Sequence, residues 1–203
     1  MTTDWTAAVA HLRRADARLV PHIERHGLPT LAPTADPIRS LARAIVSQQL
    51  STKAADTIWG RFLALYPRAA FPKPAAIAAT DDRALRGAGL SGAKAAAVKD
   101  LARHVLEQKL VPSRLVAAAD DEVAAMLLPV RGIGPWSVDM FLMFALARPD
   151  VLPVGDLGIR KGMQRHFRLR SLPEAPKMQK LAKVWQPYRT VACWYLWRSL
   201  EPG

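Results

Sequence analysis

The chain has 203 residues, of which 50% are hydrophobic and 23% are charged. This length fits one well-buried domain, or two lobes that share a core, and the composition excludes an intrinsically disordered chain. Lysine and arginine number 29 against 17 acidic residues, and the resulting net charge of +12 favours a polyanionic partner such as a nucleic acid.

The residues present also exclude several kinds of site. The one cysteine, Cys193, cannot build a disulfide framework, a four-thiolate zinc site or an iron–sulfur cluster, and the five histidines show no metal-ligand spacing. The N-terminus lacks a basic region followed by an apolar run, and no apolar stretch approaches the roughly 18 residues of a membrane span. We therefore expect no cofactor, no membrane contact and a cytoplasmic location, with nucleoid association in a bacterial cell.

Helical periodicity recurs along the chain while alternating strand patterns are hard to find, so the sequence predicts an all-α fold. Asp36 followed by Pro37 marks the start of a helix whose apolar residues at 38, 41, 42, 45 and 46 share one face. Ser51 and Ser91 are predicted caps of two further helices. Those two helices end near Pro67 and Glu107, and others are expected at about 81–87, 122–128, 135–147, 157–167, 176–184 and 188–200.

The stretch 28–35 contains two prolines and no helical period, and it is the best candidate for a linker. It is expected to join an N-terminal helical piece to a central bundle. We predict a single domain over 1–203, with a central helical lobe at 36–150 and a second helical lobe formed by 1–35 together with 151–203.

A short glycine-containing segment lies between the helix expected to end at Leu128 and the one that begins at Pro135. Its two glycines, Gly132 and Gly134, allow a tight turn that exposes successive backbone N–H groups while Ile133 fills the space below. Such a turn at a helix N-terminus is an anion site. The alternative interpretation is an ordinary helix–helix turn with a glycine cap.

The segment LPVRGIGPWSVD at 128–139 resembles the hairpin of the helix-hairpin-helix DNA glycosylases, in particular the 3-methyladenine DNA glycosylase II family. IVSQQLS at 45–51, LPVGDLGI at 152–159 and the run from Tyr188 to Trp197 agree with that family in the same order. The resemblance implies two helical lobes with a DNA-binding cleft between them. It also implies the compact form, without the N-terminal β-rich domain of larger bacterial relatives.

The resemblance assigns the catalytic role to Asp156, which follows Gly134 by 22 residues. A carboxylate at this place would stabilise the oxocarbenium-like transition state of glycosidic cleavage and would orient or deprotonate the attacking water. The alternative is that Asp156 only caps the helix that begins at Leu157, and the two roles are compatible. Asp139 is the rival candidate for the catalytic carboxylate. The alternative is that it forms a pair with a purely structural role.

Two tryptophans match aromatic positions of the family's base pocket, Trp136 and Trp197. An aromatic pocket favours cationic or electron-poor alkylated purines by stacking and cation–π attraction. For both residues the alternative is a place in the core. Relatives that also nick the backbone carry a lysine nucleophile where Trp136 stands, so the resemblance implies a monofunctional enzyme that leaves an abasic site.

The family fills the hole left by the extruded base from the loop after its first core helix, which corresponds to Gln48, Gln49 and Leu50. Family members often place an apolar wedge where this chain has Gln49. The alternative for the two glutamines is an ordinary polar helix end. Phosphate contacts are expected from the hairpin residues Arg131, Gly132, Ile133 and Gly134. Scattered basic residues are further candidates, namely Arg39, Lys53, Lys94, Arg160 and Lys161. For these basic residues, a position on a solvated face is almost as good an explanation.

The resemblance predicts hydrolytic removal of 3-methyladenine- and 7-methylguanine-type bases from duplex DNA by a monomer. A monovalent cation held by hairpin carbonyls is a further expectation from the resemblance. Two alternatives remain open from the sequence: a non-catalytic helix-hairpin-helix module that binds DNA, and a glycosylase for uracil, mismatched or oxidised bases.

Overall fold

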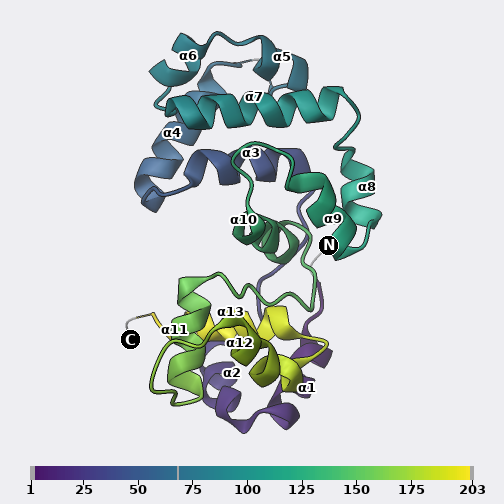
Figure 1. Ribbon diagram of the computed structural model, residues 1–203, viewed down its shortest axis with the longest axis vertical. Helices are drawn as coiled ribbons and strands as arrows, with labels where there is room; N and C mark the ends of the chain where they lie inside the picture. The colour runs from purple at the N-terminus through teal and green to yellow at the C-terminus, as the bar shows by residue number, and fades with distance from the viewer. Residues whose placement is uncertain (1–2, 68, 202–203) are drawn as a thin grey trace. The chain divides into compact units, whose positions relative to one another are not determined.

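The computed structural model describes residues 3–67 and 69–201, and these residues form helices and connecting loops without a strand. The all-α prediction is confirmed. The chain divides into two compact units (Figure 1): a central unit from Thr34 to Val138, and a terminal unit made of the chain up to Pro33 together with the chain from Asp139 on. No described helix combines the length and the apolar character that a membrane crossing requires.

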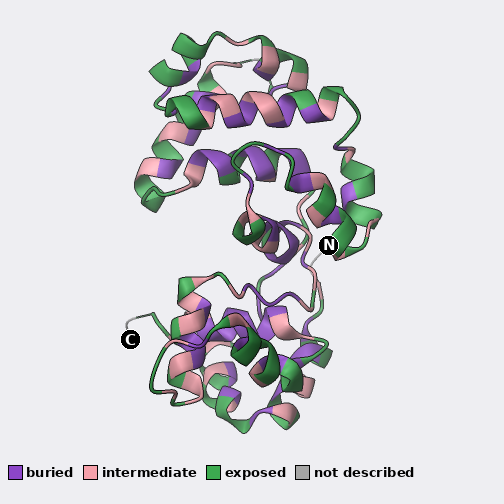
Figure 2. Cartoon of the chain, viewed as in Figure 1, coloured by how far each residue is buried: buried purple, intermediate pink, exposed green. Residues whose placement is uncertain are grey.

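The central unit is built on α3, Pro37–Ser47, which packs against α4, Thr52–Ala64, and α7, Gly92–Leu106. Asp36 caps α3 by accepting a hydrogen bond from the Arg39 N–H at 2.9 Å. The apolar face predicted for this helix is buried, and Figure 2 shows α3 mostly in the colour of buried residues. The unit is completed by α5, Pro74–Ala79, α6, Asp82–Gly87, α8, Pro112–Ala117, α9, Asp120–Leu127, and the first part of α10, Pro135–Met140.

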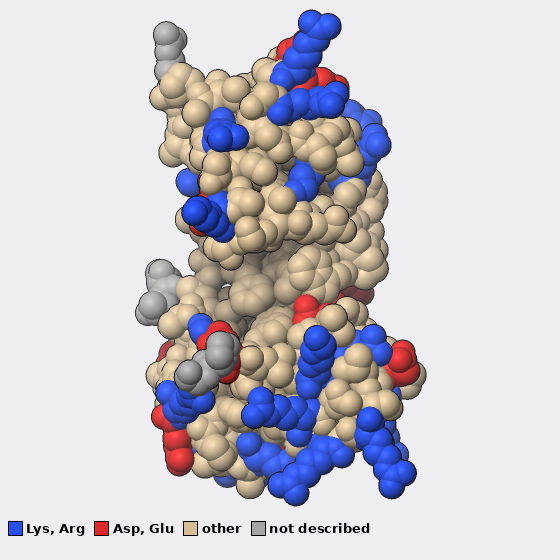
Figure 3. Space-filling view, turned by 90° about the vertical axis from the view of Figure 1, so that its left-hand side faces the viewer, with Lys and Arg blue, Asp and Glu red and all other residues tan. Residues whose placement is uncertain are grey.

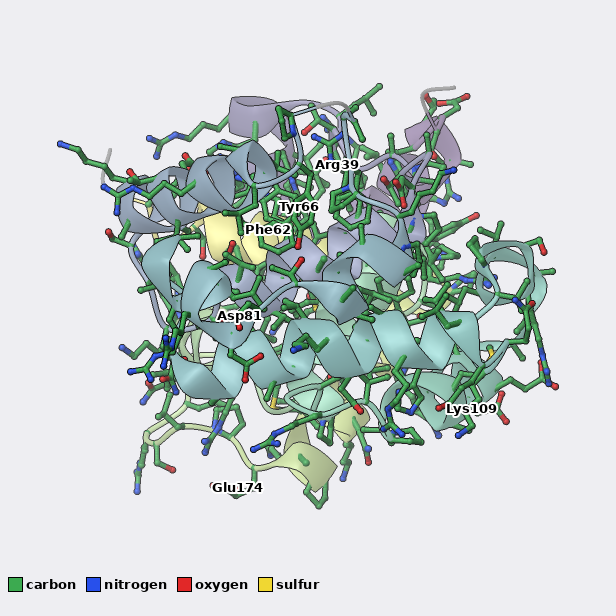
Figure 4. The ribbon with its side chains drawn as sticks, turned by 90° about the horizontal axis from the view of Figure 1, so that it is seen from above. Arg39, Phe62, Tyr66, Asp81, Lys109 and Glu174 are labelled. Carbon is green, nitrogen blue, oxygen red and sulfur yellow. The ribbon has the colours of Figure 1, made fainter. Side chains whose placement is uncertain are left out.

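Aromatic side chains extend the core of the central unit along α4. Phe62 is fully buried, and its ring centroid lies 5.4 Å from that of Trp59 and 5.5 Å from that of Tyr66. Figure 4 shows Phe62 and Tyr66 side by side. The Tyr66 hydroxyl also shares a hydrogen bond of 2.7 Å with Thr80, which ties the end of α4 to the end of α5.

The terminal unit surrounds α13, Arg189–Arg198, which packs against α11, Leu157–His166, and α2, Val20–His26. Residues 190–196 of α13 are all buried, because other helices cover this helix on several sides. The unit also contains α1, Thr6–Ala15, a 3₁₀ turn at Ala17–Leu19, α12, Ala175–Leu181, and a 3₁₀ turn at Ala182–Trp185.

The division differs from the expected lobes, which placed residues 139–150 with the central lobe. These residues contact the terminal unit instead, because the start of α13 binds them. Thr190 donates through its backbone N–H to the Pro149 carbonyl at 3.0 Å and through its hydroxyl to the Arg148 carbonyl at 2.6 Å. Arg189 pairs with Asp150, with Nε 2.7 Å from Oδ1.

Two features of the helices were not predicted. The helices α5 and α8 each span six residues and begin at a proline, and so short a segment shows no helical period. The helix expected at 135–147 is α-helical only to Met140 and continues as a π-helical segment, Phe141–Ala145. Such a wide turn alters which side chains share a face, and π-helical segments are frequent at functional sites.

Candidate functional site

The hairpin of the central unit joins α9 to α10 and has the geometry that its glycines predict. Gly132 has a φ of +79°, in the left-handed region, and a Cβ built on it would lie 3.2 Å from the Ala97 Cβ of α7. Both the backbone conformation and the close approach to α7 therefore require glycine here. Ile133 is 6% exposed, as expected for the residue that fills the space below the turn.

Two side chains outside the hairpin hold its backbone. Asp100, on α7, accepts a hydrogen bond from the Arg131 N–H at 2.8 Å, and Gln48 donates through Nε2 to the Gly132 carbonyl at 2.8 Å. Burial opposes the ionisation of Asp100, but the hydrogen bonds from Arg131 and Arg103 outweigh it and lower the pKa of this carboxyl. The carboxylate thus stays charged and keeps the hairpin on α7.

The N–H groups of Gly132 and Gly134 have no hydrogen-bond partner within the described residues. Gly132 is exposed, and a Cβ built on Gly134 would meet no atom within 4 Å. Unpaired N–H groups at an accessible helix start attract anions. The hairpin therefore presents two backbone N–H groups that are open to an anion, while the Arg131 N–H is already occupied by Asp100.

The loop after α3 separates the roles of the two glutamines expected to enter DNA. Gln48 is bound to the hairpin, whereas Gln49 is exposed and has a φ of +56°, which is uncommon for a residue with a side chain. Leu50 beside it is 37% exposed. Lys94 fixes the loop from α7 by donating through Nζ to the Val46 and Gln48 carbonyls at 2.8 and 2.7 Å. The exposed pair Gln49 and Leu50 is thus the part of the loop that can reach a ligand.

Trp136 stands in the first turn of α10, directly after the hairpin, and is 46% exposed. Its exposure argues against a place in the core of the central unit.

In the terminal unit Asp156 directly precedes α11 and caps it, which is one of the two roles considered for this residue. Its Oδ1 caps the helix by accepting from the Ile159 N–H at 2.7 Å, and the same oxygen accepts from the indole Nε1 of Trp197 at 2.9 Å. The structure therefore brings the predicted catalytic carboxylate and one predicted pocket tryptophan into direct contact. Two donors fix the position of this carboxylate at the N-terminal end of the helix.

Two glycines on one face of α11 make this contact possible. A Cβ on Gly158 would lie 2.9 Å from both Cδ1 and Nε1 of Trp197, and a Cβ on Gly162 would lie 3.0 Å from the Leu196 Cβ. Residues four apart lie above one another on a helix, so the two glycines form a groove that lets α13 approach α11 closely. The sequence GIRKG at 158–162 thus sets the distance between Trp197 and Asp156.

Phe144 is a candidate pocket residue that the sequence did not reveal. Its ring is stacked on that of Trp197, with the centroids 5.5 Å apart and an interplanar angle of 30°, and it is 46% exposed. Phe144 lies in the π-helical segment. Its helix is rich in apolar residues throughout, so the sequence pattern could not distinguish an exposed phenylalanine from a buried one. The exposed Phe144 and the partly buried Trp197 together form an aromatic surface beside Asp156.

The rival carboxylate, Asp139, differs from Asp156 in its surroundings. Burial raises the pKa of Asp139 to about 6, and no hydrogen bond to its carboxyl oxygens is made within the described part of the chain. It has no ion pair with a described residue, so the structural pair considered for it is not seen.

The expected basic contacts fall into two groups. Lys94 holds the α3 loop, and Arg160 binds the Pro173 carbonyl and Glu174, so both have structural partners. Arg39, Lys53 and Lys161 are exposed. Figure 3 shows lysine and arginine side chains on the surfaces of both units.

Known proteins resemble this chain along nearly its whole length. DNA-3-methyladenine glycosylase 1 of Schizosaccharomyces pombe is 34% identical over 204 residues, which cover 98% of this chain and 89% of that protein. A structure of 3-methyladenine DNA glycosylase from the same yeast, in complex with abasic DNA, superimposes with a TM-score of 0.85 and 32% identity over 96% of both chains. A DNA-3-methyladenine glycosidase from Bacillus halodurans gives a TM-score of 0.84 and 37% identity over 98% of this chain and 91% of its own.

Residues 42–187 match the profile of a family described as HhH-GPD superfamily base excision DNA repair protein. This range contains the α3 loop, the hairpin, Trp136 and Asp156. The chain therefore belongs to the HhH-GPD superfamily of base excision DNA repair proteins.

Proposed function

We propose that this protein is a monofunctional DNA glycosylase that flips alkylated purines, of the 3-methyladenine and 7-methylguanine type, out of duplex DNA and removes them by hydrolysis. Relatives at 34 and 37% identity that are named 3-methyladenine glycosylases or glycosidases support the reaction. The assignment of Asp156 as the catalytic residue rests on its position at the start of α11, where two donors hold its Oδ1.

Asp156 would act on the sugar of the extruded nucleotide. Cleavage of the glycosidic bond develops positive charge on the sugar, and a fixed carboxylate stabilises that charge and directs a water to the anomeric carbon. The Ile159 N–H and the Trp197 indole hold the carboxylate at its place, so little reorganisation is needed during the reaction. This hydrolysis uses water and a carboxylate, and the proposal includes no cofactor.

The aromatic surface of Phe144 and Trp197 supports the choice of alkylated purines. A methylated purine with positive charge gains roughly 0.5–2 kcal/mol from each cation–π contact with such rings. Its glycosidic bond is already weak, so modest assistance from the protein is enough. In the central unit, Trp136 offers an exposed aromatic side chain directly after the hairpin, and its part in base binding remains a prediction.

The hairpin would bind the phosphate backbone through the unpaired N–H groups of Gly132 and Gly134, with Arg131 as an added charge. Gln49 and Leu50 would occupy the space that the extruded base leaves in the duplex. Trp136 stands where strand-nicking relatives carry a lysine, so no Schiff base is expected and the product is an abasic site. We propose that the protein acts as a monomer, and a cation at the hairpin carbonyls remains a prediction.

The decisive experiment measures the release of methylated bases from methylated duplex DNA by the purified protein and by Asp156→Asn. Asparagine also caps helices, so this variant should fold and bind DNA while its rate of base release falls by at least about a hundredfold. Asp36→Asn is the matched control, because Asp36 caps α3 in the same way and should be replaceable without loss of release.

Four other results would contradict parts of the proposal. Base release by Asp156→Asn at the unchanged rate would remove the catalytic assignment. DNA binding without release of any base, including uracil, hypoxanthine and 8-oxoguanine, would favour a binding module, and release of one of those bases instead would change the substrate class. Strand breaks without alkali would contradict the monofunctional reaction.

A further inference from the structure

A cavity of about 640 Å³ opens in the terminal unit at the end of α11 opposite to Asp156. A ten-residue helix spans about 15 Å, so this cavity lies too far from Asp156 to hold the phosphates next to a nucleotide bound there. Its walls come from the 3₁₀ turn before α2, from α2, from the end of α11 and from the end of α13. The lining residues are Arg18, His22, Arg165, His166, Phe167, Arg168 and Ser199.

Positive charge dominates this cavity because no acidic side chain lines it among the described residues. Arg165 donates through Nη1 to the Ser199 carbonyl at 3.0 Å, which orients its guanidinium without neutralising it. Arg168 has no ion pair with another described residue. The negative end of the α11 dipole is equivalent to roughly half a charge, which is less than either guanidinium supplies.

A buried network behind the cavity fixes two of its walls. Asp16, 4% exposed, accepts from Nε of Arg18 at 2.7 Å, from Nε2 of His166 at 2.8 Å and from Nε1 of Trp185 at 3.0 Å. The Arg18 guanidinium also lies over the Phe167 ring, 4.4 Å from its centroid. Arg18 and His166 are therefore held in place before any ligand arrives, which lowers the entropic cost of binding.

The pKa of His22, which lines the cavity, responds to the electrostatic potential there. Burial and the positive charges of His166, His26, Arg165 and Arg25 lower the pKa of His22. An anion in the cavity would offset these charges and raise the pKa of His22 again.

We propose that this cavity is a second anion site, which binds phosphate groups through Arg165 and Arg168 against the preformed wall of Arg18. Guanidinium groups bind phosphate oxygens in bidentate fashion, and the cavity has room for two linked phosphates. The ligand is either a small diphosphate compound or a distant stretch of a nucleic-acid backbone, which share this chemistry. The inference is independent of the reaction proposed for Asp156.

The test follows the His22 ring signals by NMR while inorganic pyrophosphate is added to the full chain at constant ionic strength. Saturable shifts and a raised His22 pKa are expected. Arg168→Gly should weaken pyrophosphate binding by about tenfold or more, since a hydrogen bond between charged groups is lost. Arg168 has a φ of +52°, where glycine is favoured, so this variant removes the charge without backbone strain.

Arg170→Gly is the matched control, because Arg170 is exposed, lies two residues further along and does not line the cavity. It should bind pyrophosphate as the unaltered chain does. A parallel titration with undamaged duplex DNA distinguishes the two sources of phosphate. If the DNA shifts the His22 signals and Arg168→Gly abolishes those shifts, the ligand is a backbone phosphate. If only pyrophosphate shifts the His22 signals, the ligand is a small molecule. No His22 response to either ligand, or equal weakening by both variants, would overturn the proposal.

Discussion

Trp197 donates a hydrogen bond from its indole Nε1 to Oδ1 of Asp156 at 2.9 Å, and its ring is also stacked on Phe144. One side chain therefore contributes to the aromatic surface and to the orientation of the carboxylate. This double role connects the recognition of a base to the position of the group proposed to cleave it.

Trp197→Phe should separate the two contributions, because phenylalanine keeps an aromatic ring and loses the indole donor. We expect kcat for base release to fall by roughly tenfold to a hundredfold, in line with the loss of a hydrogen bond to a charged group. Single-turnover kinetics on methylated duplex would measure this change. Trp194→Phe on the same helix is the control, since Trp194 does not contact Asp156, and equal losses in both variants would argue against the positioning role.

Gly158→Ala should damage the site although alanine is the better helix former. The added Cβ would lie 2.9 Å from the Trp197 ring and 3.0 Å from Asp156 Oδ1, so at least one of these side chains must move. We expect base release to fall at least about tenfold and the melting temperature to drop.

The control for Gly158 is Gly60→Ala in α4, where the new methyl group would meet no atom within 4 Å. That variant should gain about 0.5–1 kcal/mol of stability from helix propensity and keep full activity. Thermal unfolding and base release would be measured on both variants. Wild-type activity in Gly158→Ala would show that the contact between α11 and α13 does not set the geometry of Asp156.

Asp100→Ala should weaken the binding of undamaged duplex DNA without changing its salt dependence. In this variant the Arg131 N–H loses its acceptor, and the hairpin loses its hydrogen bond to α7. We expect the free energy of DNA binding to weaken by about 1–2 kcal/mol, which is roughly fivefold to thirtyfold in affinity. No phosphate contact is removed, so the slope of log K against log salt should stay the same. Arg131→Ala, in contrast, should lower that slope by about one if Arg131 contacts a phosphate.

Fluorescence anisotropy at several salt concentrations would measure both variants. Asp82→Ala is the control for the loss of a negative charge, because Asp82 of α6 pairs with Lys99 of α7 at 2.7 Å and does not touch the hairpin. Removing a negative charge alone should strengthen DNA binding slightly. An Asp100→Ala variant that behaves like Asp82→Ala would contradict the proposed role of Asp100.

The sequence predicted those parts of the molecule that depend on neighbours along the chain. The cap at Asp36, the buried face of α3 and the tight turn at Gly132 follow from local patterns and are present in the structure. The cap by Asp156 is likewise present. Each of these features needs only a few consecutive residues to specify it.

Contacts between distant segments could not be predicted in this way. Asp100 and Arg131 are 31 residues apart, and nothing in either local sequence indicates their hydrogen bond. Phe144 is exposed because a π-helical segment carries it, and an apolar stretch does not reveal that change of helix type. The bond of Gln48 to the hairpin spans 84 residues and was likewise hidden.

Asp139 provides a pH-dependent test of which carboxylate acts. Burial raises its pKa to about 6 in the folded protein, above the value of about 3.9 in an unfolded chain. Folding therefore disfavours the ionised form of Asp139, and this lowers the free energy of unfolding. The loss of stability is absent below the unfolded pKa, grows as the pH rises between the two pKa values and is complete above about 6.

Asp139→Asn should therefore stabilise the protein at pH 8 by about 1–3 kcal/mol, and the difference should vanish near pH 3, roughly one unit below the unfolded pKa, where the aspartate is neutral in both states. Denaturant unfolding at the two pH values would measure this change, and the measurement at low pH serves as its own control. Base release should remain near the wild-type rate, because Asp139 is proposed to have no part in the reaction. A loss of release as large as that expected for Asp156→Asn would instead assign a catalytic role to Asp139, whose raised pKa would then suit a general base that works near neutral pH.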